Sequence, residues 1–111
     1  MNVEFYKKVI KQNILDKKNS ILVVAGSHND FLIFRELKYK NVTISNLDER
    51  LLDDQFKPYN WSRQNAECLT FADKSFDYVV VNMGLHHCFS PHKALLEMYR
   101  VAYKGVICIE N

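Results

Sequence analysis

The strongest constraint on the fold is a series of short apolar runs, rich in β-branched residues, separated by stretches with helical periodicity. Ile21–Ala25 and Tyr78–Val81 are apolar without the alternation of a half-exposed strand. Strands of this kind are buried on both faces, which is typical of a parallel sheet covered by helices. We therefore expect an α/β protein in which helices connect the strands of a mainly parallel sheet.

The predicted helices and strands alternate along the chain, as consecutive β-α-β units require. Helices are expected over residues 3–15 and 31–37, and a third is opened by Ser90 and Pro91 and ended by Gly105. Asn29 or Asp30 is expected to cap the second helix. The buried stripe of the third helix is predicted to contain Ala94, Leu95, Met98 and Val101. Strands are expected at Ile21–Ala25, Val42–Ser45, Trp61–Asn65, Phe76–Val81 and Val106–Ile109.

Length and charge limit the classes of protein to which the chain can belong. Its 111 residues fit one domain over 1–111, with an N-terminal helix within 1–18 and a core over 20–111. The net charge is only +2 and the lysines are scattered, so we expect no nucleic-acid partner. The longest apolar strand-like run, Tyr78–Val81, is far too short to span a bilayer.

The cysteines and the N-terminus indicate a reducing compartment. The chain has 3 cysteines, Cys68, Cys88 and Cys108, which form no C-x-x-C pair. This number and spacing argue against a disulfide framework and against a zinc site. The first residues lack a continuous apolar stretch, so no signal peptide is predicted. A cytoplasmic location is therefore expected.

The residues that follow the predicted strands are polar or small, which suits a ligand site. In open parallel sheets, ligands bind beyond the carboxyl ends of the strands. Small side chains let backbone N–H groups approach a ligand closely, and a carboxylate or amide after the second strand can bind ribose hydroxyls. The segments concerned are Ala25–Asp30, Asn46–Glu49, Asn65–Glu67 and Asn82–His87. For any single segment, the alternative of an ordinary polar loop stays open.

Three motifs in the second half of the chain resemble one enzyme family. Residues 65–80, with the sequence NAECLTFADKSFDYVV, resemble the D-A-x-x-L-P-F-x-x-x-S-F-D-x-V motif of class I S-adenosylmethionine-dependent methyltransferases. Leu85-His86-His87 resembles the L-H-H that follows the fourth strand in that family, and residues 91–101 resemble its P-x-x-A-L-x-E-x-x-R-V helix. The motifs occur in the family's order and spacing, and the resemblance covers residues 20–110.

The resemblance implies a fold and an activity. The fold is a Rossmann-like three-layer sandwich around a mainly parallel five-stranded sheet of order 3-2-1-4-5. Members usually continue with a further helix and two strands, which this chain lacks. The implied activity is methyl transfer from S-adenosylmethionine to a small-molecule acceptor, leaving S-adenosylhomocysteine, as in type 11 methyltransferases.

The resemblance also assigns cofactor-binding roles to individual positions. The first loop would pass under the methionine part of the cofactor. Asn46 falls on the family's ribose-binding acid, and Asp48 lies two residues on and is able to take over that role. Asn65 and Ala66 would border the adenine, and Asn82 and Met83 would face the cofactor near its sulfonium. The predicted cofactor residues are Ala25, Gly26, Ser27, Asn29, Asn46, Asp48, Asn65, Ala66, Asn82 and Met83.

The chain departs from the family where the first loop should be richest in glycine. In the pattern h-h-D-h-G-x-G-x-G, the acid becomes Val23 and the glycines become Ala25, Ser27 and Asn29. Side chains other than glycine adopt positive φ with difficulty, although Asn tolerates it better. Asn46 and Asn65 also replace acids, which removes a charged-bond increment of roughly 1 kcal/mol each. These departures predict weakened cofactor affinity.

His86 is the candidate catalytic residue. It follows the fourth strand, where the methyl group would emerge, and an oxygen nucleophile benefits from a base with a pKa near the working pH. The alternative is that one of His86 and His87 packs under the loop while the other is solvated. No metal site is expected, because no carboxylate or thiol spacing supports one.

Two functions therefore compete for this sequence. The first is an S-adenosylmethionine-dependent methyltransferase core. The second is a non-catalytic or degenerate Rossmann-like module that binds a nucleotide weakly or serves as an interaction surface. A nicotinamide dehydrogenase is disfavoured, because the first loop lacks G-x-G-x-x-G.

The last predicted strand, Val106–Ile109, bears on assembly. As the final strand of the chain, it would form an apolar edge with helix cover missing on one face. Such an edge invites pairing with another chain. We expect a homo-oligomer, or a piece of a longer protein.

Overall fold

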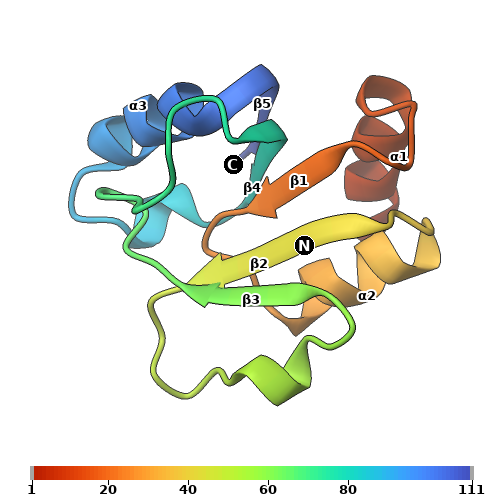
Figure 1. The fold of residues 1–111 in the computed structure, drawn as a ribbon, viewed down its shortest axis with the longest axis horizontal. Helices are drawn as coiled ribbons and strands as arrows, with labels where there is room; N and C mark the ends of the chain where they lie inside the picture. Colours follow the sequence, from red (N-terminus) through yellow and green to blue (C-terminus); the bar gives the residue numbers. More distant parts are fainter. Residues whose placement is uncertain (1, 111) are drawn as a thin grey trace.

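A five-stranded parallel sheet forms the centre of the structure, a computed structural model that describes residues 2–110. The strands lie in the order β3-β2-β1-β4-β5, and every neighbouring pair is parallel. Figure 1 shows β1, β2 and β3 running side by side in one direction. The strands are β1 (Ser20–Val23), β2 (Asn41–Asn46), β3 (Asn60–Arg63), β4 (Phe76–Asn82) and β5 (Ala102–Ile109). The predicted fold class and strand order are confirmed.

Within the described part of the chain, three α-helices and two short 3-10 helices accompany the strands, and all but the first helix lie between strands. The α-helices are α1 (Val3–Asn13), α2 (His28–Glu36) and α3 (Pro91–Val101). The 3-10 helices are η1 (Asp53–Gln55), between β2 and β3, and η2 (Leu85–His87), after β4. Ser90 caps α3 as predicted, since its side chain accepts a hydrogen bond from Lys93 N. Within residues 2–110, no helix is long and apolar enough to cross a membrane.

The central strands divide their side chains between two hydrophobic cores. Ile21 and Val23 of β1 face a core that includes residues of α1 and α2. Leu22, between them in sequence, and Val24, just after the strand, face a second core that includes residues of α3. Successive residues of a strand point to opposite faces of a sheet, so the unalternated apolar run places helices on both faces.

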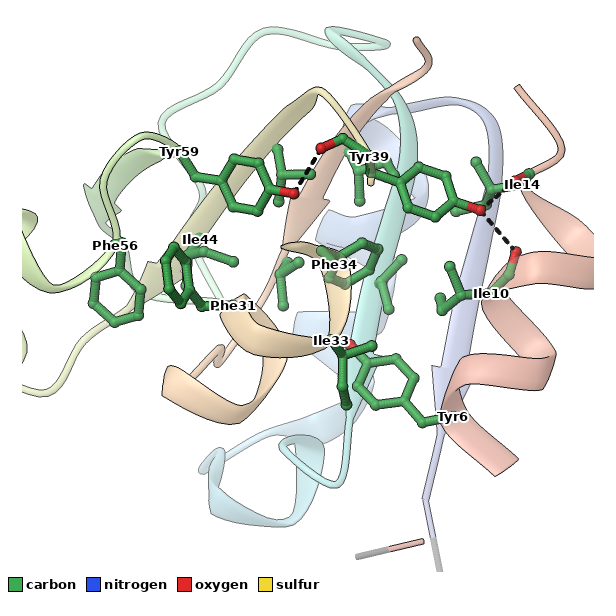
Figure 2. Packing of buried hydrophobic residues seen from close by; sticks show 14 residues of the cluster. Tyr6, Ile10, Ile14, Phe31, Ile33, Phe34, Tyr39, Ile44, Phe56 and Tyr59 are labelled. Carbon is green, nitrogen blue, oxygen red and sulfur yellow. Dashed lines mark hydrogen bonds between the residues drawn. The ribbon is translucent and has the colours of Figure 1, made fainter. Parts of the chain in front are cut away.

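Tyrosine hydroxyl groups fasten α1 to the rest of the first core. The Tyr39 hydroxyl donates to the carbonyl oxygens of Ile10 and Ile14 at the end of α1, and the Tyr59 hydroxyl donates to Tyr39 O at 2.6 Å (Figure 2). These are buried polar groups satisfied by partners distant in sequence. The N-terminal helix is therefore an integral part of one layer.

The predicted start of the second helix was wrong. The helix begins at His28 and its N-cap is Ser27, whereas Asn29 or Asp30 was expected. Asp30 stands at the third helical position, and its carboxylate accepts a hydrogen bond from Ser27 N at 2.8 Å. The last three residues of the predicted loop segment Ala25–Asp30 therefore belong to the helix, because the hydrogen bond from Ser27 N to the Asp30 side chain fixes its start.

The predicted ends of the other two helices were also too late. Helix α1 stops at Asn13, where residue 15 or 18 was expected, because Ile14 leaves the helical region at φ −116° and ψ 85°. Helix α3 stops at Val101, and Ala102 is already extended and paired with Phe76 of β4. Gly105 lies inside β5 opposite Tyr78, so it does not end the helix.

Candidate functional site

Two adjoining cavities lie at the carboxyl ends of the parallel strands. The β3-side cavity has a volume of about 230 Å³ and the α2-side cavity about 520 Å³. Both are lined by Ala25, Asn46, Gly84 and His87. The β3-side cavity is further lined by Val24, Ser45, Leu47, Gln64, Asn65, Ala66, Glu67, Cys88 and Phe89. The α2-side cavity is further lined by Ser27, Asp30, Asp48, Arg50, Asn82 and Met83.

Most of the residues singled out in the sequence meet in these cavities. Of the ten predicted cofactor residues, only Gly26 and Asn29 line neither cavity. Gly26 is a buried residue of the first loop, and Asn29 lies in a groove between α1 and α2. His86 also lines neither cavity, whereas His87 lines both. Asp30 lines the α2-side cavity, although it was not among the predicted cofactor residues.

The loop after β1 is shaped by close packing as much as by glycine. Ala25 adopts a left-handed conformation, with φ 53°. Gly26 needs its lack of a side chain for space, since an added Cβ would lie 2.8 Å from Ile44 Cγ2 and 3.0 Å from Val23 Cγ1. The loop therefore keeps the one glycine that steric packing requires and tolerates a strained alanine beside it.

Asn46 ties the loops after β1 and β2 together. Its Nδ2 donates to Gly26 O at 2.7 Å, and its Oδ1 accepts from Asp48 N at 2.9 Å. An aspartate here would place a carboxylate oxygen against the Gly26 carbonyl oxygen, where no proton is available to share. The amide is thus suited to its two neighbours, and the nearest carboxylate left for a ligand on this loop is Asp48.

Asp48 carries a charge that is already balanced within the protein. The Arg50 guanidinium donates to both of its carboxylate oxygens, with Nη2 to Oδ2 at 2.6 Å. Arg63 reaches the same turn and donates to the carbonyl oxygens of Asp48 and Leu51. The hydrogen bonds from the side chain and backbone of Arg50, together with the charges of Arg50 and Arg63, lower the pKa of Asp48 to about 2. Asp48 is therefore an ionised acceptor at the wall of the α2-side cavity.

Glu67 and Phe89 connect the loop after β3 to the loop after β4. The Glu67 carboxylate accepts a hydrogen bond from Phe89 N at 3.0 Å, and Glu67 N donates to the Asn65 side chain. The Phe89 side chain is fully exposed at the rim of the β3-side cavity, and Leu47, on the loop after β2, is 57% exposed. Two exposed apolar side chains thus flank a cavity of a size that suits a planar group.

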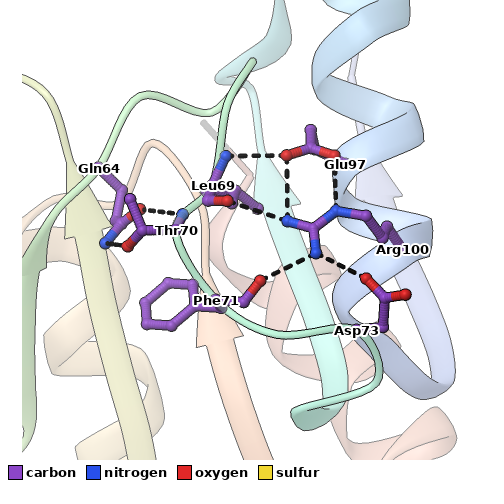
Figure 3. Close-up of polar contacts among 7 residues, drawn as sticks. All are labelled: Gln64, Leu69, Thr70, Phe71, Asp73, Glu97 and Arg100. Atoms are coloured by element: carbon purple, nitrogen blue, oxygen red, sulfur yellow. Dashed lines mark hydrogen bonds and ion pairs between the residues drawn. The ribbon is translucent and has the colours of Figure 1, made fainter.

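Arg100 of α3 holds the loop that connects β3 to β4 (Figure 3). Its guanidinium donates to the carbonyl oxygens of Leu69 and Phe71 at 2.9 Å each, and to Asp73 at 2.8 Å. Glu97, one turn earlier, pairs with Arg100 and accepts a hydrogen bond from Leu69 N at 2.9 Å. This guanidinium clamp positions the segment that brings Asn65 and Ala66 to the β3-side cavity.

A carboxylate that the sequence did not single out lies beneath the histidines after β4. Glu110 accepts a hydrogen bond from Leu85 N at 2.7 Å through Oε1, and His86 Nδ1 lies 3.9 Å from the same oxygen. Glu110 Oε2 is buried without a hydrogen-bond partner among the described residues. The two histidine rings adjoin, with centroids 4.0 Å apart. Both rings are exposed, so this end of the sheet presents titratable groups to solvent.

Comparison with known proteins identifies the family. Residues 23–109 match the methyltransferase domain family. The chain belongs to this family. Among the described residues of this methyltransferase domain, no cluster of histidine, cysteine, aspartate or glutamate is placed to hold a metal ion.

Curated relatives of this methyltransferase domain are bacterial quinone-biosynthesis enzymes. The ubiquinone/menaquinone biosynthesis C-methyltransferase UbiE of Legionella pneumophila (strain Corby) is 33% identical over 98 residues. That match covers 78% of this chain and 39% of the relative. A demethylmenaquinone methyltransferase of Anoxybacillus flavithermus is 37% identical over 66 residues, covering 58% of this chain and 28% of the relative. The chain thus spans about two fifths of the length of the Legionella relative.

Solved structures share the fold of this methyltransferase domain. The BH2331 protein of Bacillus halodurans aligns with TM-score 0.79 and 24% identity, covering 99% of this chain and 51% of that chain. An S-adenosylmethionine-dependent methyltransferase of Aquifex aeolicus aligns with TM-score 0.71 and 19% identity, covering 91% of this chain and 58% of that chain. Both likenesses confirm the Rossmann-like architecture.

Proposed function

We propose that this methyltransferase domain binds S-adenosylmethionine across the two cavities and transfers its methyl group to a small-molecule acceptor. The observation that carries the proposal is the meeting of two cavities at the carboxyl ends of β1 to β4, lined by eight of the ten predicted cofactor residues. Ligands of open α/β sheets bind at this edge. The carboxylates and amides that line the cavities suit a cofactor that carries sulfonium and ammonium charges.

The two cavities suit different parts of the cofactor. We assign the adenine to the β3-side cavity, beside the Asn65 side chain and the Ala66 backbone. The ribose hydroxyls are assigned to Asp48, because the Asn46 amide is engaged by Gly26 and Asp48 within the protein. The amino-acid part is assigned to the α2-side cavity, near Ser27, Asn82 and Met83.

The protein's contribution to catalysis is mainly alignment. When bound, the cofactor supplies a methyl group on sulfur, which is already an excellent leaving group. Holding nucleophile, methyl and sulfur in line supplies several kcal/mol without a covalent enzyme intermediate. His86 is the proposed base for an acceptor proton, and Glu110, 3.9 Å from His86 Nδ1, would stabilise the imidazolium that results.

Titration calorimetry with S-adenosylmethionine and S-adenosylhomocysteine tests this proposal. We expect saturable heat with both compounds at or below about 1 mM, and loss of binding in Ala66→Trp, because the indole would fill the β3-side cavity. Ala72→Trp is the matched control, since Ala72 is exposed on the same β3–β4 connection and does not line either cavity. Absence of heat from the unmodified chain at that concentration contradicts the proposal.

A second candidate is a module that binds the nucleotide without turnover. The observation that favours it is the loop after β1, where Ala25 replaces a glycine at φ 53° and Asn46 has its amide engaged within the protein. The whole relatives are more than twice as long as this chain, and the acceptor is not identified. Production of S-adenosylhomocysteine from S-adenosylmethionine with candidate acceptors would separate the two functions.

We also propose that the outer edge of β5 is covered, either by a second copy of the chain or by further strands of a longer protein, and that the protein works in the cytoplasm. Strand β5 pairs only with β4 among the described strands, so its outer edge presents unpaired backbone groups. The three free cysteines suit a reducing compartment. Light scattering at micromolar concentration is expected to report a dimer or larger species, and a clean monomer would contradict self-association.

A further inference from the structure

We infer that Asp30 is the residue that holds the ammonium group of the cofactor's amino-acid part. This inference rests on the proposed function. Asp30 is the third residue of α2 and lines the α2-side cavity together with Ser27, Asn82 and Met83. It is 6% exposed, and it is one of the two carboxylates in that cavity, the other being Asp48.

The hydrogen bonds of Asp30 come from neutral donors. Oδ2 accepts from Ser27 N at 2.8 Å and from Ser27 Oγ at 3.2 Å. Oδ1 accepts from the Tyr6 hydroxyl of α1 at 2.7 Å. These bonds fix the carboxylate in place at the cavity wall, and each oxygen of a carboxylate has two acceptor sites, so Oδ1 retains capacity for a ligand.

Asp30 has no cation to balance its charge within residues 2–110. No ion pair there includes it, whereas Asp48 is paired with Arg50. A buried carboxylate without a partner of opposite charge is unfavourable, and a cationic ligand group removes that cost. Burial raises the pKa of Asp30, as expected for a group whose charge is uncompensated before the ligand arrives.

Three positions at which the family pattern has an acid, 23, 46 and 65, do not supply a carboxylate to this cavity. Val23 is fully buried in the first core, and position 46 is an amide engaged by two backbone groups. Asn65 lines the β3-side cavity instead. Because an ammonium needs a charged acceptor for a strong hydrogen bond, Asp30 is the carboxylate left to supply it.

The variant Asp30→Asn tests the charge with little change in shape. Its Oδ1 can accept from Ser27 N while its Nδ2 donates to the Tyr6 hydroxyl oxygen, so the fold should survive the substitution. We expect roughly a tenfold or greater loss of affinity for S-adenosylhomocysteine, because a charge-assisted hydrogen bond is lost. Affinity for 5′-methylthioadenosine, which lacks the amino-acid part, should change by less than about twofold.

Asp48→Asn is the matched control in the same cavity. Because Asp48 is assigned to the ribose, which both compounds contain, this substitution should lower the affinities for S-adenosylhomocysteine and 5′-methylthioadenosine by similar factors. Tyr6→Phe keeps the Asp30 charge and should therefore retain most of the preference for S-adenosylhomocysteine over 5′-methylthioadenosine. Far-ultraviolet circular dichroism and thermal melting establish that each variant is folded.

The outcomes separate this inference from the proposed function. If Asp30→Asn weakens the affinity for both compounds equally, or for neither, the inference is overturned while the proposed function stands. A loss of affinity for S-adenosylhomocysteine alone supports both the inference and the proposed function. An unmodified chain that binds neither compound overturns the proposed function and the inference together.

Discussion

Gly84→Ala is expected to destabilise the protein by roughly 1–3 kcal/mol and to weaken cofactor binding, because the loops after β1 and β4 touch at this residue. A Cβ added to Gly84 would lie 2.6 Å from Ala25 Cβ and 3.0 Å from Val81 Cγ2. Neither neighbour is the flexible end of a long side chain, so backbone must move. Both cavities include Gly84 and Ala25, and both should change shape.

Urea denaturation and ligand calorimetry measure the two effects. Gly105→Ala is the matched control, because its added Cβ would meet Tyr78 Cε1 at 3.5 Å, an ordinary contact. Ala25→Gly should partly rescue Gly84→Ala, since it removes the closest clash and the strain of Ala25 at φ 53°, while the Val81 contact remains. Additive effects of the two substitutions would show that the loops do not touch as described.

Arg100→Ala is expected to cost about 2–4 kcal/mol of unfolding free energy, because several hydrogen bonds disappear at once. The carbonyl oxygens of Leu69 and Phe71 lose their guanidinium donors, and Glu97 loses its charged partner. Arg100→Lys should retain only part of the stability that Arg100→Ala loses, since an ammonium cannot reproduce the planar fork of donors of the guanidinium.

Hydrogen exchange locates the effect of Arg100→Ala. Amides of residues 64–75 should exchange faster, because the segment that the guanidinium holds is released. Arg50→Ala is the comparison for stability, since the Arg50 side chain is 89% exposed and its loss should leave the free energy of unfolding nearly unchanged. An Arg100→Ala protein as stable as this comparison would mean that the clamp contributes little.

The layout of the sheet was predictable from local pattern, while several helix boundaries were not. Unalternated runs such as Ile21–Ala25 indicate buried parallel strands, and Ser90 with Pro91 marks the start of α3. Asp30 resembles an N-cap in sequence, but it acts at the third helical position by accepting from Ser27 N. The end of α3 depends on the pairing of Ala102 with Phe76, which is a tertiary contact.

The same distinction holds in the candidate site. The positions of the predicted strand ends indicated which loops would meet. They did not indicate which side chains of each loop face the cavities. His86 and His87 are indistinguishable in sequence, and only the turn of η2 places His87 in both cavities. Asp30 depends on Tyr6, 24 positions away, and the role of Arg100 depends on carbonyl groups up to 31 positions away. Partners at such separations leave no periodic signal.

The guanidinium clamp has a consequence for how descendants of this family are recognised. Glu97, Arg100 and the Leu69–Asp73 segment lie within the motifs that carry the resemblance, and their hydrogen bonds hold a loop that does not line the cavities. Selection for a folded chain alone would preserve them after the ability to bind the cofactor had been lost. That part of the motif therefore records ancestry, and under the proposed function the side chains that report on a retained activity are those of Asp30 and Asp48.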